Sequence, residues 1–240
     1  MGFSNQVTVR KAKIGPVACY FEGQRFLGQQ YGLFLGICLV GLLIGGAVPV
    51  VLYGPMSCGI ALCYILRARG ERTDLENLFK GFEFFVPGLV ATLIYICMNF
   101  VMLIPLLVMT LVSVVGMNSQ ELVVILSSGI LLFLALAGWF VVAGITSLLF
   151  MLAAFLIVDK NLDGHVAMRL AVSGLMANFF GILSSSIVGQ LAILLGTAMC
   201  IVPGFLVFPI VLAGHFVVYQ KIFGVETLEP VMATEVDRKM

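Results

Sequence analysis

The sequence predicts an all-α protein, a polytopic transmembrane helix bundle with six spans. Of its 240 residues, 61% are hydrophobic and 10% are charged, whereas soluble domains carry about 25% charged residues. The apolar residues form long blocks, and a helix needs about 20 such residues to cross a bilayer. The cations gather between alternate blocks. The chain is therefore expected in lipid, and its net charge of +1 gives no reason to expect nucleic acid as a partner.

Three regions follow from this pattern: a cytoplasmic N-terminal segment with an amphipathic part (1–30), a six-span transmembrane domain (31–224) and a cytoplasmic polar tail (225–240). The first apolar block begins near Tyr31, too late and too long for a cleavable signal peptide, so we expect it to be retained.

The first hairpin is predicted from two apolar stretches. The first span covers about 31–52 and the second, which is short, about 55–66. Gly54 and Pro55 lie between them and predict a tight outer turn, because proline is tolerated at a helix start, where its missing N–H would be unpaired anyway.

The most charged stretch, residues 67–85, follows the first hairpin. Thr73 and Glu76 have the spacing of a capping box, which predicts a helix starting there. Apolar residues then recur at helical spacing, as in an amphipathic elbow helix at the headgroup level. The alternative is that these residues are the first turns of the next span.

The next apolar stretches are too long for single spans. One covers 84–115 and contains Pro105; the other, 122–158, would measure roughly 55 Å against a hydrocarbon core of about 30 Å. Dividing it at Gly138 would give seven spans, but no polar turn is present there to satisfy the backbone within lipid. We therefore predict one span over 136–158.

The remaining segment, 105–135, should lie on or beyond the outer surface, with Trp139 at the interface. It is too apolar to stand in water, so it must fold back onto the bundle, lie along the interface or be covered by a protein partner.

The last part of the chain predicts a second amphipathic helix over 165–175 and a fifth span over 178–200. Pro203 and Gly204 predict a turn before a sixth span over 205–219.

The distribution of cations predicts the topology. In the six-span layout all 13 Lys and Arg residues fall on one side, which the positive-inside rule assigns to the cytoplasm. We therefore expect a multi-pass protein of the bacterial inner (plasma) membrane with both termini cytoplasmic. Four cations could contact lipid headgroups or act only as topology anchors: Arg67, Arg69, Arg72 and Lys80.

A weak threefold repeat of elbow plus helical hairpin accompanies this layout. Phe21-x-Gly23-x-x-Phe26 precedes the first hairpin and Phe79-x-Gly81-x-x-Phe84 the second. In the third repeat, Ala171-x-Ser173-x-x-Met176 takes the corresponding place. The elbows would enter from one side, so the repeats would be parallel.

Several short motifs resemble those of an uncharacterised bacterial family of six-helix integral membrane proteins. They are Gly54-Pro55, Gly59, Arg67, Arg69-Gly70-Glu71, Phe79-x-Gly81-Phe82, Ala167-Met168 and Asn178. That family is loosely similar to the membrane domain of some glycerophosphodiester phosphodiesterases. The resemblance covers about 26–224 and implies fold and topology; no catalytic domain accompanies it here. Ala171 departs from the serine that such proteins often carry.

No charged residue is predicted near the middle of a span, which argues against an ion-coupled pump. Asn99, Gln190 and His215 come out at similar depth and could line a midplane polar pocket or simply form interhelical hydrogen bonds. We find no catalytic motif, no cofactor-binding motif and no metal-ligand spacing, including among the six cysteines. We therefore expect no enzymatic activity.

Small residues on two predicted spans favour close helix packing, either within the chain or in a homo-oligomer. They are Gly32, Gly36, Gly41 and Gly45 on the first span, and Gly181, Ser185 and Gly189 on the fifth.

Two functions remain from the sequence. The first is a non-enzymatic scaffold, assembly or accessory subunit that docks partners through 105–135 or through small-residue helix faces. The alternative is a transporter or channel for a small neutral or lipidic solute, with the midplane polar residues lining its path.

Overall fold

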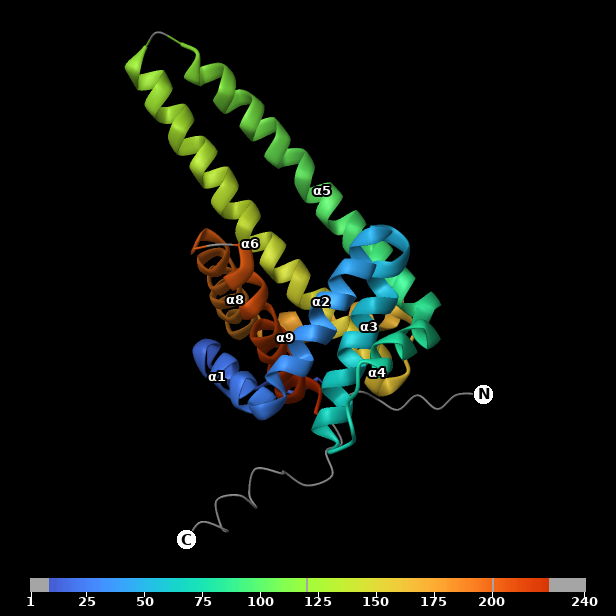
Figure 1. Cartoon of the computed structure of the whole chain (residues 1–240). Helices are drawn as coiled ribbons and strands as arrows, with labels where there is room; N and C mark the ends of the chain where they lie inside the picture. The colour runs from blue at the N-terminus through green and yellow to red at the C-terminus, as the bar shows by residue number, and fades with distance from the viewer. Residues whose placement is uncertain (1–8, 120, 200, 225–240) are drawn as a thin grey trace.

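A computed structural model describes residues 9–119, 121–199 and 201–224. This part of the chain is helical and contains no strand (Figure 1). The α-helices are α1 (Pro16–Leu27), α2 (Tyr31–Ala47), α3 (Pro49–Ala68), α4 (Glu76–Phe79), α5 (Phe85–Met117), α6 (Leu122–Lys160), α7 (Gly164–Ala177), α8 (Phe179–Met199) and α9 (Ile201–Phe223), with 3-10 turns η1 (Gly28–Gln30) and η2 (Lys80–Phe84).

Six helical segments are long and apolar enough to cross a membrane, which confirms the predicted six-span helical class. They contain α2, α3, α5, α6, α8 and α9, and pair as three sequential hairpins. In each hairpin the second helix is more buried than the first. The core is formed by the second helices, α3, α9 and residues 144–157 of α6, whereas α2, α5 and α8 bury a smaller share of their residues.

Each short helix lies on the inner helix of another hairpin: α1 on α9, α4 with η2 on α3, and α7 on α6. Gly23 and Gly81 make the first two contacts possible. A Cβ at Gly23 would lie 2.7 Å from the Gly214 nitrogen, and one at Gly81 would lie 2.5 Å from the Gly59 nitrogen. These two glycines hold matching places in the proposed sequence repeat. The repeat itself stays a prediction.

The predicted outer turn at Gly54–Pro55 is wrong. Helix α2 ends at Ala47 and α3 begins at Pro49, after Val48 (φ −132°, ψ 80°), which lies outside the αR region that is disfavoured before proline. Gly54 and Pro55 lie buried inside α3. Gly54 is needed there for packing, because its Cβ would lie 2.3 Å from the Gly88 carbonyl oxygen of α5.

The turn predicted at Pro203–Gly204 is also wrong, since both residues lie inside α9, which begins at Ile201. Proline at the third helical position loses no intrahelical hydrogen bond. Gly204 packs against α8, where a Cβ would lie 2.7 Å from the Thr197 hydroxyl. Both errors arise because glycine and proline here serve helix packing and helix starts.

The capping box is not formed. Helix α4 begins at Glu76 with no side-chain cap, and the Thr73 hydroxyl is buried with no hydrogen-bond partner among the described residues. A short helix nevertheless precedes the third span, because α4 and η2 are separate elements before α5. The second amphipathic helix, predicted over 165–175, is confirmed as α7.

A buried carboxylate joins the three inner helices at one end of the bundle. Asp159, in the last turn of α6, is 1% exposed and pairs with Arg69 at 2.8 Å and with Lys160 at 3.3 Å. Tyr219 of α9 donates a hydrogen bond of 2.7 Å to Asp159 Oδ2, whereas Arg69 binds Oδ1. Asn161 then adopts a left-handed conformation (φ 49°) and ends α6. We call this the cation end.

Asp159→Ala should therefore lower the free energy of unfolding by about 3 kcal/mol, the lower end for a broken buried pair, because Arg69 retains partial exposure. Tyr219→Phe removes one hydrogen bond and should cost about 1 kcal/mol. Denaturant unfolding in detergent micelles measures both. The control is Asp163→Ala, since Asp163 is exposed and makes no cap hydrogen bond; an equal loss in that variant would contradict the assignment.

Candidate functional site

The distal parts of α5 and α6 form an apolar hairpin that extends beyond the other helices (Figure 1). We call residues 105–135 the distal hairpin. Helix α5 continues through Pro105, and α6 runs unbroken through Gly138. At 1.5 Å per residue, the 39 residues of α6 measure roughly 58 Å. The bilayer core is about 30 Å thick. The segment thus protrudes from the bundle.

Small residues hold the two arms of the distal hairpin together. Ser113 is fully buried between them and Ser128 nearly so. Gly116 permits this approach, because a Cβ there would lie 2.0 Å from the Ser128 hydroxyl. The small residues of the two arms therefore pack against each other, and the large side chains point outward.

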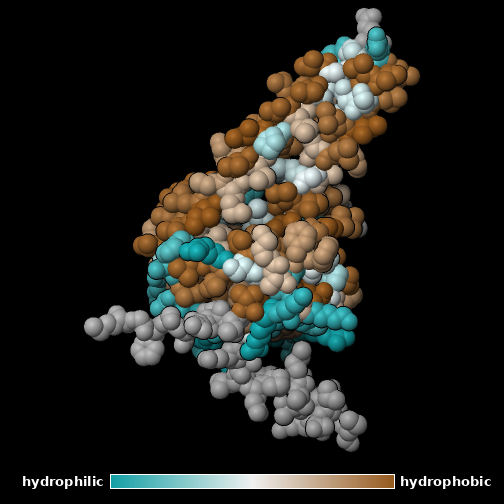
Figure 2. All heavy atoms as spheres, turned by 180° about the vertical axis from the view of Figure 1, so that it is seen from behind, coloured by the Kyte–Doolittle hydropathy of each residue, from teal (hydrophilic) through white to brown (hydrophobic). Residues whose placement is uncertain are grey.

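The outer surface of the distal hairpin is almost entirely apolar (Figure 2). Its exposed large side chains are Leu107, Val108, Met109, Leu111, Val112, Val114, Val115, Met117, Leu122, Val123, Leu126, Ile130, Phe133 and Leu134. Glu121 is its one charged residue. Such a surface binds by shape and dispersion rather than by charge.

The three midplane polar residues lie in different helix interfaces. Asn99 of α5 donates to its own helix at Tyr95 (2.8 Å) and accepts a long hydrogen bond from Thr146 of α6 (3.4 Å). Gln190 of α8 reaches the Phe140 carbonyl of α6 at 3.5 Å. Among the described residues, no hydrogen bond joins any two of Asn99, Gln190 and His215.

His215 lies on α9 beside Tyr20 of α1. The two rings meet edge-on with centroids 6.4 Å apart, and the Tyr20 hydroxyl donates to the Ser185 carbonyl at 2.7 Å. His215 is buried, and its Nδ1 has no partner among the described residues. The Tyr20 contact ties α1 to α8 and α9, a role that its place in the N-terminal segment did not reveal.

The small-residue candidates divide into packed and open positions. Gly41 and Gly45 leave space for the close approach of α3. Gly181, Ser185 and Gly189 leave space for the side chains of Ile14 and Tyr20. A Cβ at Gly32 or Gly36 would meet nothing within 4 Å. Most of the predicted stripe thus serves packing within the chain.

Two of the four candidate headgroup cations make internal contacts instead. Arg67 donates to the last carbonyls of α1, Phe26 (2.7 Å) and Leu27 (3.2 Å), and Arg69 pairs with Asp159. Arg72 is exposed and pairs with Asp74 at 2.9 Å, and Lys80 is exposed.

Asn178 fixes the N-terminal segment, a role that sequence reasoning missed. It is buried where α7 meets α8, accepts from the Ala12 N–H at 2.8 Å and donates to the Arg10 carbonyl at 3.0 Å. The Arg10 N–H in turn donates to the Ile222 carbonyl at 2.9 Å. No group of three His, Cys, Asp or Glu in the described ranges could hold a metal ion.

The packed and open glycines give a matched test. Gly189→Leu should destabilise the protein by about 1–3 kcal/mol, because its Cβ would lie 2.5 Å from the Tyr20 hydroxyl in a filled interface. Gly32→Leu faces open space and should leave the melting temperature in detergent unchanged. Equal destabilisation by the two variants would show that these packing assignments are incorrect.

With these sites described, comparison with known proteins adds no relative, because no family model, curated protein or solved structure matches this chain.

Proposed function

We propose that this chain is a non-enzymatic assembly or accessory subunit of a bacterial inner-membrane complex. In this proposal, the six-span bundle anchors the distal hairpin, which docks onto another membrane protein. The observation that carries it is the protrusion of an apolar, closely packed helix pair beyond the rest of the bundle.

The length and chemistry of α6 support a protein partner. A helix of roughly 58 Å would have to tilt by about 60° to fit within a core of about 30 Å. Without such a tilt, the distal hairpin exposes a row of large apolar side chains outside the hydrocarbon. Soluble surfaces rarely expose such an extended apolar patch, and large ones mark interaction sites. A second protein would cover it.

The positive charges at the cation end support a cytoplasmic location for that end of the bundle, which lies opposite the distal hairpin. Arg69, Lys160 and Lys221 take part in ion pairs there. Figure 2 shows a hydrophilic band at the end of the molecule away from the protrusion. The Arg10–Ile222 hydrogen bond brings both ends of the described chain to this face. By the positive-inside rule this end is cytoplasmic, so the distal hairpin would point outward from the cell.

The placement of the polar residues favours docking over transport. A transporter binds its solute where polar groups converge near the midplane. Asn99 and Gln190 instead contact α6 at two positions, Thr146 and the Phe140 carbonyl. His215 contacts Tyr20 of α1.

Site-specific photocrosslinking in intact membranes tests the docking role. A photoreactive residue at Phe133, on the distal hairpin and 71% exposed, should give one discrete adduct whose partner is identified by mass spectrometry. The same residue at Phe180, on α8 and 83% exposed, is the matched control and should give no protein adduct.

The identified partner must then co-purify with the unmodified chain and lose at least tenfold in yield with Leu111→Gln/Val123→Gln, since both side chains lie on the proposed surface. Adducts of equal yield at Phe133 and Phe180 would contradict the proposal, and an adduct with a second copy of this chain would replace it with self-association.

Cysteine accessibility tests the orientation. With Ser119→Cys, near the tip of the distal hairpin, an impermeant thiol reagent added to intact cells should label the chain. With Glu71→Cys, beyond the cation end of α3, labelling should require permeabilised cells. The unmodified chain sets the background, since Cys97 is exposed. Reversed labelling would refute the orientation.

A further inference from the structure

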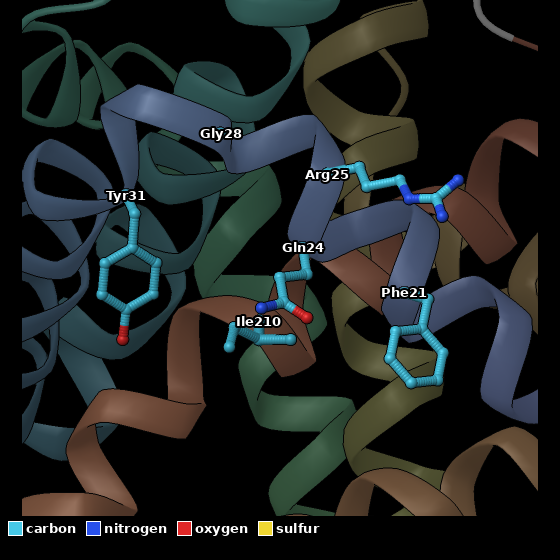
Figure 3. Close-up of a pocket in the computed structure, with 6 residues that line it drawn as sticks. All are labelled: Phe21, Gln24, Arg25, Gly28, Tyr31 and Ile210. Carbon is cyan, nitrogen blue, oxygen red and sulfur yellow. The ribbon is translucent and has the colours of Figure 1, made fainter.

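A shallow cavity of about 600 Å³ opens where α1 turns into α2, against α9 (Figure 3). Six residues line it: Phe21, Gln24, Arg25, Gly28, Tyr31 and Ile210. In Figure 3, Phe21, Gln24 and Tyr31 point to the same side of the α1–α2 bend, with the Gln24 amide beside Ile210, while the Arg25 side chain extends away from Gly28 and Tyr31. The cavity thus has apolar walls with one amide between them, and a guanidinium group at one edge of its rim.

The bend that forms the cavity is fixed by specific contacts. Helix α1 ends at Gly28, whose φ of +46° favours glycine. Arg67 of α3 binds the last carbonyls of α1, and the Tyr31 hydroxyl donates to the Leu206 carbonyl of α9. These contacts hold the Tyr31 ring as one wall, so the cavity is a built feature of the fold.

One guanidinium group, that of Arg25, gives the rim its charge. Arg25 is exposed and pairs with no carboxylate among the described residues. Arg67 is not a lining residue, because its guanidinium donates to the Phe26 and Leu27 carbonyls. The acidic residue on this part of α1, Glu22, is neutralised by Lys221 at 2.8 Å. The rim therefore favours an anion.

The cavity lies at the level of the membrane where such an anion is found. Its rim is at the cation end, and its wall and floor residues belong to the apolar segments Pro16–Ala47 and Pro203–Phe223. The surface around it is exposed and apolar, and in a bilayer it contacts acyl chains. Phosphate groups lie just beyond the hydrocarbon, next to basic residues at span ends.

We propose that this cavity binds one anionic phospholipid of the leaflet at the cation end. An acyl chain lies against Phe21, Tyr31 and Ile210, and the phosphate lies at the rim beside the Arg25 side chain. Gln24 donates a further hydrogen bond to the headgroup. The bound lipid fills the angle between α1 and α2 and holds α1 against α9.

The test uses the purified full chain, delipidated in mild detergent, with native mass spectrometry counting bound lipid. Phosphatidylglycerol and phosphatidylcholine with identical acyl chains are titrated separately. The unmodified chain should bind one phosphatidylglycerol with at least tenfold preference. Arg25→Gln should reduce phosphatidylglycerol affinity about tenfold, the cost of one charge-assisted hydrogen bond, and reduce phosphatidylcholine affinity by a smaller factor, because choline offsets the charge of that phosphate.

Arg72→Gln is the matched control, because it removes the same charge from an exposed residue that is not among those lining the cavity. It should bind phosphatidylglycerol as the unmodified chain does. Ile210→Trp should abolish the site for both lipids by filling its floor. Since Arg25 is exposed, its variant tests the proposal even if Ile210→Trp does not fold. Equal affinity for the two lipids, or equal losses in Arg25→Gln and Arg72→Gln, would overturn it.

Discussion

The ion pair of Asp159 with Arg69, completed by the Tyr219 hydroxyl, is the interaction on which the bundle depends, because it joins α3, α6 and α9 through one carboxylate. In the bundle, α3, α9 and residues 144–157 of α6 are largely buried, so relative sliding would displace the whole core. A buried charge without partners is costly. Asp159 therefore fixes the register of three helices that are far apart in the sequence.

Glycine provides the complementary constraint higher in the bundle. Hydrophobic burial contributes little to association between helices in lipid, so close van der Waals contact must supply the stability. Gly54 and Gly88 bring α3 and α5 together, and Gly144 admits Ser186 and Gln190 of α8 to α6. The Asp159 ion pair stabilises helix packing at one end of the bundle, and close backbone contact stabilises it along the spans.

Composition and block length were sufficient to predict the helical class, the six spans and the short helix α7, because they depend on local sequence. Turn positions were not predictable in the same way. Pro55 and Pro203 lie inside helices, and the choice between a turn and a packed helix at Gly54 depends on Gly88, which belongs to another span.

The site residues show the same limit. Similar depth in the membrane placed Asn99, Gln190 and His215 at one level but could not fix the direction in which each helix face points. The internal contacts of Arg67 and Arg69 could not be predicted from sequence, because their carbonyl and carboxylate partners lie 40 or more residues away. The excess apolar length of 105–135 was recognisable in the sequence, whereas its arrangement as a protruding helical hairpin was not.

The continuity of α6 gives the molecule a mechanical property. One unbroken helix connects the carboxylate at its base to the tip of the protrusion, and a straight α-helix bends little over this distance. With an arm of roughly 58 Å, each degree of rotation at the base displaces the far end by about 1 Å. Small rearrangements among basic side chains at one end of α6 would thus become lateral movements at the other end.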